Sequence, residues 1–473
     1  MSIRSVQALA LVCASLIALA GCASVPLPPL PDATPSAWQQ PVHATSVAAP
    51  DLRSWWKAFN DPQLDRLVDA ALADNLTIRQ AALRIDASRA LAGSAHAAFR
   101  PQLSAHTFSE PTPDSSASYF QMGFDARWEL GLFGRAQSRA RVTAADLGIA
   151  ESDIQSARVS VVAEVVRCYV EFRGATSRLV LLQQVAANAD EKSRLTATRL
   201  RLRLASEREL AQVQAEAANA QAALIESRLT IDSARQRMAV LLARSEVMPD
   251  LITDDAPIGV RSEAIDSVPA DLLRTRPEIR RAENEVLKAA GELGLARADL
   301  YPRLGLGGAL TYASKVIGHT RLSDADGIVT FGPAIEIPLF DWGARRAVVT
   351  ARDAELSASL LAYRQAVLEG IAEAQTAMTT LERQRERLGI LQRARDSFER
   401  SDAASVALHR AGLADGIDLA TSRTALVQAR IEVAQAQQQC DIAFVALYKA
   451  MGGAPLPDAE RAHSDAGTDV HSQ

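Results

Sequence analysis

The sequence predicts a mainly α-helical protein with a small β part, built from two copies of one structural module. Three observations support this: short patterns that recur about 200 residues later, long heptad stripes without proline, and four stretches of alternating apolar and polar residues. The composition agrees, because only 5% of the 473 residues are aromatic while alanine is abundant, which suits closely packed helices. A net charge of −5 argues against a nucleic-acid binder, which would carry a basic surface.

The duplication is visible as paired segments along the chain. Three pairs match at offsets of 201, 207 and 209 residues: Phe99–Leu103 with Leu300–Leu304, Leu132–Phe133 with Leu339–Phe340, and Leu204–Ala205 with Leu413–Ala414. The offset drifts only in the middle, as insertions in loops would make it drift. We therefore predict a first structural repeat over residues 51–250, a linker over 251–270, a second repeat over 271–453 and a flexible tail over 454–473.

Each copy contains a pattern typical of a long helical hairpin. Apolar and small residues recur at spacings of four and three, which keeps one side of a helix against a neighbour. No proline interrupts residues 143–248 or 339–454. The stripe of the first copy and its counterpart at offset 209 include these positions: Ile154, Val161, Val165, Cys168 and Phe172, then Tyr363, Val367, Gly370, Ala374 and Ala377.

A different period precedes each helical hairpin and predicts β-hairpins at about 102–130 and about 303–338. Apolar side chains alternate with polar ones, as in Phe120, Met122, Phe124, Ala126 and Trp128 and in Val329, Phe331, Pro333, Ile335 and Ile337. Strands of about ten residues can cross an outer membrane when tilted. A soluble sheet is the alternative, but it would leave the aromatic residues facing water. Four strands cannot close a membrane barrel, so we expect the chain to pool strands with copies of itself.

The first residues indicate export. Arg4, a short apolar stretch and the small residues Ala20 and Gly21 are typical of a signal peptide over residues 1–21. Leu19-Ala20-Gly21-Cys22 resembles the bacterial lipoprotein box, which implies N-acyl and diacylglycerol lipid on Cys22; the alternative is an ordinary signal peptide with a chance cysteine. Residues 22–50 would form a proline-rich tether, and Ala23, in place of an aspartate that resembles an inner-membrane retention signal, favours the outer membrane.

Several blocks together resemble the TolC-like outer membrane factors. The matching blocks are Arg276–Gly308, Pro338–Gly343, Trp128–Arg135, Trp55–Leu64 and Ala446–Gly453. With the lipid box, the chain is similar to the NodT-type lipoprotein branch. The resemblance implies a homotrimer with a twelve-strand barrel in the outer membrane and a twelve-helix α-barrel tube in the periplasm. It also implies a periplasmic adaptor (membrane fusion protein) and an inner-membrane pump of the resistance–nodulation–division class as partners.

The tips of the two helical hairpins are the candidate functional sites. Ser206–Glu209 and Asp415–Asp418 each fit a helix cap followed by a carboxylate three residues later. The resemblance implies that Asp418 helps to close the periplasmic mouth, and Asp415 is a substitute because Thr421 stands where the family's second gate aspartate would fall. Arg203 stands where Gly412 ends the preceding helix in the second copy, so we expect the first tip to turn differently.

The residues that turn between the helices are candidate adaptor contacts, with packing between neighbouring hairpins as an equally weighted alternative. They are Leu204, Ala205, Gly412, Leu413 and Ala414.

No arrangement of residues predicts catalysis. The seven histidines show no metal-ligand spacing, and no nucleophile and base combination rises above chance. We therefore expect no enzyme activity, no metal and no cofactor other than the lipid on Cys22. A passive exit duct for small molecules is the predicted function. The alternatives are the duct of a type I protein secretion system and a lipid-anchored coiled-coil adaptor that conducts nothing.

Overall fold

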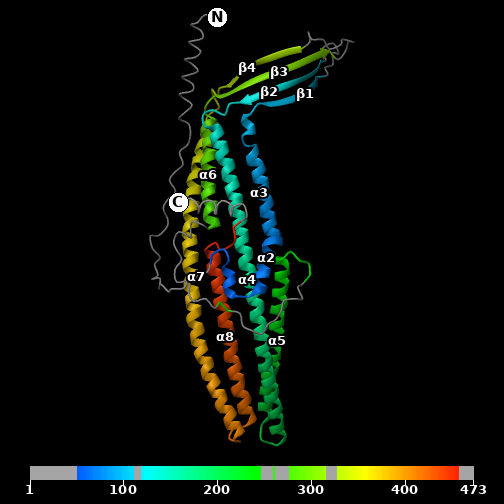
Figure 1. The fold of residues 1–473 in the computed structure, drawn as a ribbon, viewed down its shortest axis with the longest axis vertical. Helices are drawn as coiled ribbons and strands as arrows, with labels where there is room; N and C mark the ends of the chain where they lie inside the picture. Colours follow the sequence, from blue (N-terminus) through cyan, green and yellow to red (C-terminus); the bar gives the residue numbers. More distant parts are fainter. Residues whose placement is uncertain (1–50, 111–118, 247–258, 261–275, 316–326, 457–473) are drawn as a thin grey trace, which may run out of the picture. The chain divides into compact units, whose positions relative to one another are not determined.

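The order helix, two strands, long helix and shorter helix occurs twice along the chain. The computed structural model describes residues 51–110, 119–246, 259–260, 276–315 and 327–456 (Figure 1). The predicted signal peptide, Cys22, the tether, nearly all of the linker and the tail beyond residue 456 lie outside the described residues. The first repeat contains η2 (Trp55–Phe59), α2 (Pro62–Asp74), α3 (Leu76–Ser94), η3 (Ala97–Phe99), β1 (Gln102–Glu110), β2 (Tyr119–Glu129), α4 (Arg135–Arg201) and α5 (Glu207–Leu241). The second contains α6 (Pro277–Ala298), β3 (Arg303–Lys315), β4 (Gly327–Glu336), α7 (Ala344–Arg410) and α8 (Gly416–Ala450). Among the described elements, η2, α2 and η3 belong to the first repeat alone.

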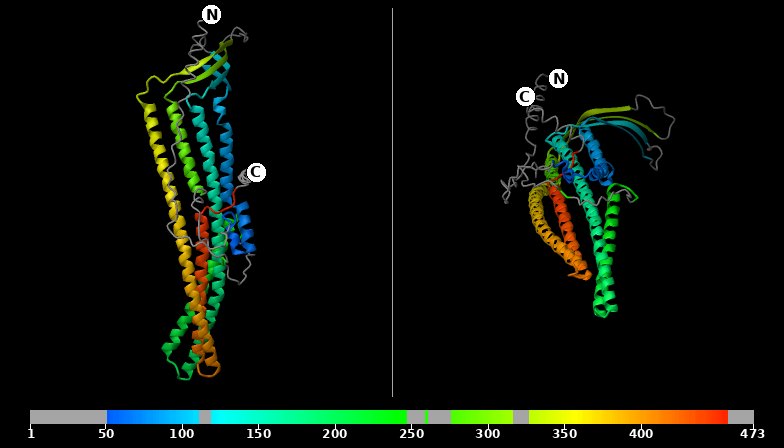
Figure 2. Two further views of the ribbon diagram at one scale, coloured as in Figure 1. Left: turned by 60° about the vertical axis from the view of Figure 1, so that its left-hand side comes forward. Right: turned by 60° about the horizontal axis from the view of Figure 1, so that its bottom comes forward.

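The long helices confirm the predicted duplication. Helices α4 and α7 have 67 residues each, and α5 and α8 have 35 residues each. In each repeat the long helix is followed by its shorter partner, which runs back beside it (Figures 1 and 2). The predicted stripes are buried along their middle parts, with Val165, Cys168 and Ala374 fully buried. None of the described helices carries a stretch long and apolar enough to span a bilayer.

The four strands belong to one compact unit, which includes residues 83–152 and 278–366. They form a single antiparallel sheet in the order β1-β2-β3-β4, so β1 and β4 are its edges. Both predicted hairpins are therefore confirmed, including the weakly alternating strand at β1. The predicted polar loops between paired strands fall largely outside the described residues. In the same unit α6 packs against α7 through a small core of Val286, Ala290, Leu293 and Leu356.

An ionic cluster joins the sheet to the helices of this unit. Arg135, at the start of α4, forms an ion pair with Asp299 and lies 3.4 Å from a Glu129 oxygen. Arg303 donates to the same Asp299 carboxylate at 2.7 Å. Burial alone would raise the pKa of Asp299, but the two arginine hydrogen bonds outweigh it and hold the pKa below its usual value. The end of α6 is thereby fixed to the beginning of α4.

The second unit includes the described residues within 51–82, 153–277 and 367–456, and it holds the largest core among them. Trp55 is fully buried and stacks on Tyr448 with ring centroids 5.3 Å apart, while its indole Nε1 donates to the Gly453 carbonyl at 3.1 Å. The Tyr169 hydroxyl donates to Asp61 at 2.7 Å. Trp55 and Asp61 therefore attach the segment before α2 to the end of α8 and to α4, and the indole N–H of the buried Trp55 has a hydrogen-bond acceptor.

A buried carboxyl group in this unit holds the described linker residues against α8. Asp441 is only 2% exposed, and its Oδ1 accepts hydrogen bonds from the Val260 amide at 3.3 Å and from Gln437 Nε2 at 3.1 Å. Burial raises the pKa of Asp441 from 3.8 to about 7, although both hydrogen bonds act in the opposite direction. Ionisation of this carboxyl group therefore weakens the folded state.

We predict that Asp441→Asn stabilises the protein in a pH-dependent way. Between pH 4 and 7 the unfolded chain has already lost the Asp441 proton while the folded chain keeps it, so the free energy of unfolding falls as the pH rises. The variant should raise the thermal unfolding midpoint at pH 8 and leave it nearly unchanged at pH 4, measured by circular dichroism. Asp232→Asn, at a side chain that is 73% exposed, is the control. Equal shifts at both pH values would contradict the buried assignment.

Candidate functional site

The register of the sheet separates an apolar face from a polar one. Residues directly opposite each other in antiparallel strands share a face. One such row runs Leu103, Ala126, Gly308, Phe331, and the next runs Ala105, Phe124, Leu310, Val329. Together with Met122, Trp128, Leu306 and Ile335 on the same side, these residues form what we call the apolar strand face. The alternation read from the sequence is thus confirmed across all four strands.

The described residues leave most of the apolar strand face uncovered. Phe124 is 49% exposed, and on β4 Val329 and Phe331 are 75% and 81% exposed. An uncovered apolar face of this extent marks a surface that meets lipid or another protein. The sheet therefore provides an apolar wall on one side.

The opposite face of the sheet is mostly polar. It carries Gln102 with Arg127, and Ser104 with Asp125 and Thr330. His106 Nδ1 lies 2.9 Å from an Asp125 carboxylate oxygen on this face. On β3 and β4 this face also carries small residues such as Ala309 and Ala334, and the large apolar residues Phe108 and Ile328 lie near the loop ends of their strands. Lipid on one side and water on the other is the environment that such a two-faced sheet fits.

Both helix tips carry the capping box that the sequence predicts. Ser206 Oγ accepts from the Glu209 amide at 3.2 Å, and Glu209 Oε2 accepts from the Ser206 amide at 2.7 Å. Asp415 Oδ1 accepts from the Asp418 amide at 2.8 Å, and Asp418 Oδ2 accepts from the Asp415 amide at 3.3 Å. The hydrogen bonds from Ser206 hold the pKa of Glu209 below its usual value. Four acidic or hydroxyl side chains thus satisfy the free amides at the starts of α5 and α8.

The expectation that the first tip turns differently is wrong. Arg203 adopts a left-handed backbone conformation with φ of 59°, and Gly412 adopts the same conformation with φ of 73°. The Leu204 amide donates to the Arg199 carbonyl at 2.8 Å, and the Leu413 amide donates to the Leu408 carbonyl at 2.9 Å. Both helices end in this six-residue hydrogen-bonded turn, which satisfies their last carbonyls. A non-glycine residue here costs roughly 1–2 kcal/mol, and these bonds outweigh that cost at Arg203.

The predicted adaptor contacts lie at the described turns. Leu204 and Leu413 are 65% and 75% exposed, and Gly412 is exposed beside them. Ala205 and Ala414 are half-buried, and the Ala414 carbonyl oxygen lies 3.0 Å from His409 Nδ1. Leu204 and Leu413 are thus exposed at equivalent backbone positions, and the first tip also exposes Leu202, at 65%.

An ion pair that the sequence did not predict connects the two tips. Arg199 Nη1, near the end of α4, lies 3.1 Å from Asp415 Oδ2, at the start of α8. Beside it, a Cβ on Gly416 would come within 2.9 Å of Leu195 Cδ1 on α4, so glycine allows the close approach of these two helices. Arg199 and Asp415 are 216 positions apart, and no local pattern in the sequence links them. The one signal near this site is the basic last turn of α4, which contains Arg199 and Arg201.

The two exposed aspartates differ in their surroundings. Asp415 caps α8 and meets Arg199, whereas Asp418 completes the capping box from the first turn of the helix. Exposed ion pairs stabilise a protein by about 0–1 kcal/mol, so the Arg199–Asp415 contact can open at little cost. Thr421, at the position of the missing second aspartate, donates its hydroxyl hydrogen to the Ile417 carbonyl within its own helix at 2.8 Å.

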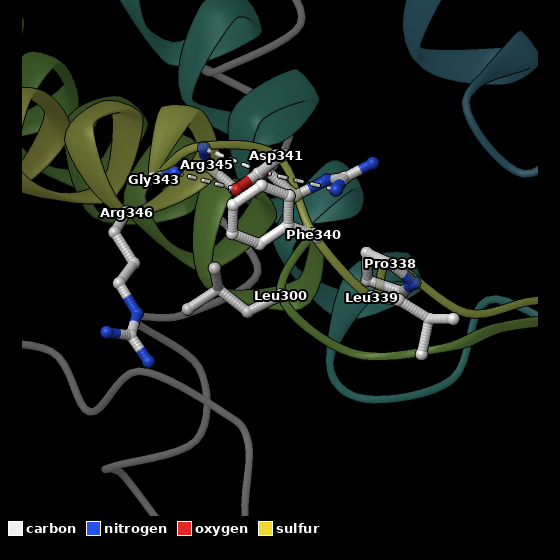
Figure 3. Close-up of a pocket in the computed structure, with 8 residues that line it drawn as sticks. All are labelled: Leu300, Pro338, Leu339, Phe340, Asp341, Gly343, Arg345 and Arg346. Atoms are coloured by element: carbon white, nitrogen blue, oxygen red, sulfur yellow. Dashed lines mark hydrogen bonds and ion pairs between the residues drawn. The ribbon is translucent and has the colours of Figure 1, made fainter.

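The described residues contain no group of three or more histidine, cysteine, aspartate or glutamate side chains that could hold a metal ion. Cys168 and Cys440 are buried on α4 and α8, and burial raises the pKa of each thiol to about 11. A thiol with so high a pKa is a poor nucleophile. An open hollow of about 390 Å³ lies beside the turn between β4 and α7, where Leu300 and Phe340 flank it and Asp341 accepts hydrogen bonds from Gly343 and Arg345 (Figure 3).

Comparison with known proteins places these features in one family. Two segments, residues 67–244 and 268–453, match the family model described as outer membrane efflux protein. Nodulation protein T of Rhizobium leguminosarum bv. trifolii is 24% identical over 86% of this chain and 89% of its own length. The pyoverdine export outer membrane protein OpmQ of Pseudomonas putida is 27% identical over 92% and 95% of the two chains.

A solved structure agrees with the sequence relatives. The outer-membrane channel OprN superposes with a TM-score of 0.79 at 28% identity, over 92% of this chain and all of that one. The two matched segments correspond to the two structural repeats, and they include both helix tips and all four strands. The chain belongs to the outer membrane efflux protein family.

Proposed function

We propose that three copies of this chain form the outer membrane exit duct of a tripartite efflux system. Each copy contributes four strands to a twelve-strand barrel, whose apolar strand faces meet lipid and whose polar faces line the opening. The long helical hairpins form a twelve-helix tube in the periplasm. The apolar strand face carries this proposal, because no single copy can enclose it or complete its open sheet edges.

The duct conducts passively, and its cargo is small molecules. Energy comes from an inner-membrane pump of the resistance–nodulation–division class, which delivers its substrate through a periplasmic adaptor. Family membership and the pyoverdine export relative support small molecules over a secreted protein. The lipid-facing aromatic residues support a duct over a non-conducting spacer, since a spacer needs no such residues.

The helix tips close the periplasmic end of the duct. Asp418 or Asp415 from three copies would form an acidic ring at a narrow opening, and like charges crowded together attract cations. The weak Arg199–Asp415 ion pair would hold the tips inward, and the adaptor would engage the exposed Leu204 and Leu413 and release them. Gly412, Ala205 and Ala414 shape the same adaptor-facing turns.

A lipid anchor on Cys22 would hold the mature chain at the outer membrane. Several acyl chains make such an anchor stable, at about 0.8 kcal/mol for each buried methylene. We expect radiolabelled palmitate to enter the wild-type protein and not Cys22→Ser, when cells are labelled and the protein is isolated. Equal labelling of the two proteins would refute the assignment of Cys22.

Conductance across planar bilayers tests the duct and its gate. We expect purified protein to give single-channel current steps, and Asp418→Ala or Asp415→Ala to reduce cation preference, because each substitution removes charge from the proposed ring. Glu209→Ala is the matched control: it removes the equivalent carboxylate from the first capping box, so it costs a similar amount of helix stability.

Three outcomes of the conductance experiment separate the proposals. A change confined to the aspartate variants supports the gate. Equal changes in Glu209→Ala and Asp418→Ala would show that the effect comes from lost helix capping, and the gate assignment would fall. Absence of current steps from the wild type and from both aspartate variants would contradict the duct itself.

A further inference from the structure

The contact between the two repeats of one chain is a template for the contact between two copies. Within the chain, the last strand of the first repeat, β2, pairs with the first strand of the second repeat, β3. Among the described strands, β4 and β1 each have a partner on one side only. These two edges are the repeat-related equivalents of β2 and β3. The same contact can therefore form once more, between β4 of one copy and β1 of the next.

The backbone fixes which residues are equivalent. Phe133 and Trp342 both have positive φ, at 56° and 57°, and each is followed by a glycine with positive φ. The Arg135 amide donates to the Leu132 carbonyl, and the Ala344 amide donates to the Asp341 carbonyl. Phe133 therefore corresponds to Trp342, 209 residues later. The sequence match instead pairs Phe133 with Phe340, 207 residues later. Two additional residues before Trp342 account for the difference.

The pairing of the strands indicates the same equivalence between residues of the two repeats. Gln102 lies opposite Arg127 in the first hairpin, and Arg303 lies opposite Glu336 in the second. The first strands of the two hairpins are thus related by 201 residues and the second strands by 209. Turn geometry and strand pairing agree that Trp342 is the counterpart of Phe133.

In the template, the turn after β2 packs on the segment before β3. The Phe133 ring stacks on Tyr301 with centroids 5.2 Å apart and an interplanar angle of 12°. The Leu130 amide extends the ladder by donating to the Leu304 carbonyl at 3.0 Å. These contacts partly cover the turn that leads into α4, where Phe133 is half-buried and Leu130 is 38% exposed.

The equivalent turn after β4 has no such cover from the described part of its own chain. Trp342 is 90% exposed and Leu339 is 89% exposed. Phe340, which meets Trp342 edge to face at 4.7 Å, is also exposed and flanks the open hollow with Leu300 (Figure 3). Large apolar side chains with this much exposure, in a segment whose repeat equivalent is packed, indicate a surface completed by a second copy.

We propose that residues 335–342 of one copy dock on residues 97–107 of a neighbouring copy in the register of the β2–β3 contact. This inference rests on the proposed trimer and specifies its strand interface. Trp342 takes the place of Phe133, and Arg100 of the neighbouring copy takes the place of Tyr301. Tryptophan is the best ring for cation–π pairs and arginine is their commonest cation, so the aromatic stack of the template becomes a Trp–Arg contact.

The register follows from the two offsets. Leu339 lies opposite Leu103 of the neighbouring copy, Ile337 lies opposite Ala105, and Ile335 lies opposite Thr107. All of these side chains then extend the apolar strand face across the junction. Pro333 has no amide hydrogen to donate to a neighbouring strand. The hydrogen bonds between copies therefore form between Pro333 and the turn that follows β4. Between these pairs, Glu336 faces His106 across a non-hydrogen-bonded position, where side chains approach most closely.

Disulfide cross-linking tests the register in the full-length protein. We expect the double variant Glu336→Cys with His106→Cys to form linked dimers and trimers on mild oxidation, seen on denaturing gels without reductant. Glu336→Cys with Ser104→Cys and Glu336→Cys with Phe108→Cys are matched controls that shift the register by two residues in either direction. They should link several-fold less. The wild-type chain shows the background from its own cysteines, of which Cys168 and Cys440 are buried.

The possible results are distinguishable. Preferential linking in either shifted control overturns the proposed register, and absence of linking in all three variants of an intact oligomer overturns the interface. If the protein is monomeric before oxidation, that result contradicts the trimer of the proposed function as well as the interface. As a second measurement, Trp342→Ala and Arg100→Ala should each lower the temperature at which the oligomer dissociates, and the double variant should lower it no further than Trp342→Ala. Fully additive shifts would contradict the Trp–Arg contact.

Discussion

The need to satisfy backbone polar groups at an open sheet edge constrains the whole molecule. In hydrocarbon an amide or carbonyl group without a partner costs several kcal/mol, so an open sheet is not stable there. This chain combines an apolar strand face with two edges, β1 and β4, that pair on one side only. In the duct that we propose, neighbouring copies complete the sheet at these two edges.

Because the chain is duplicated, the same kind of contact can form between its two repeats and between neighbouring copies. Helices α4 and α7 have equal lengths, as do α5 and α8, and both tips end in the same turn and begin again with the same capping box. A chain built in this way can alternate equivalent contacts within and between copies around a closed ring. The two repeats differ at a few positions. The ion pair between Arg199 and Asp415 joins one end of each repeat, and Phe133 stacks on Tyr301 whereas its counterpart Trp342 is exposed.

The sequence predicted the elements because their periods are local and strong. Strand alternation around Phe124 and the heptad stripe through Val165 depend only on neighbouring residues, and burial matches both. Three features were missed for different reasons. The left-handed turn at Arg203 is held by hydrogen bonds that override the preference for glycine. The Arg199–Asp415 pair joins residues far apart in the chain. The equivalence of Trp342 with Phe133 depends on their shared backbone angles, whereas residue identity pairs Phe133 with Phe340.

Native mass spectrometry of the protein in lipid nanodiscs tests most directly whether sister copies complete the wall. We expect a particle that contains three chains and remains associated until the bilayer is removed. A particle with a single chain, stable in water without lipid or detergent, would mean that its strand face is shielded from within. That result would contradict the constraint from which the duct, its gate and the junction between copies follow.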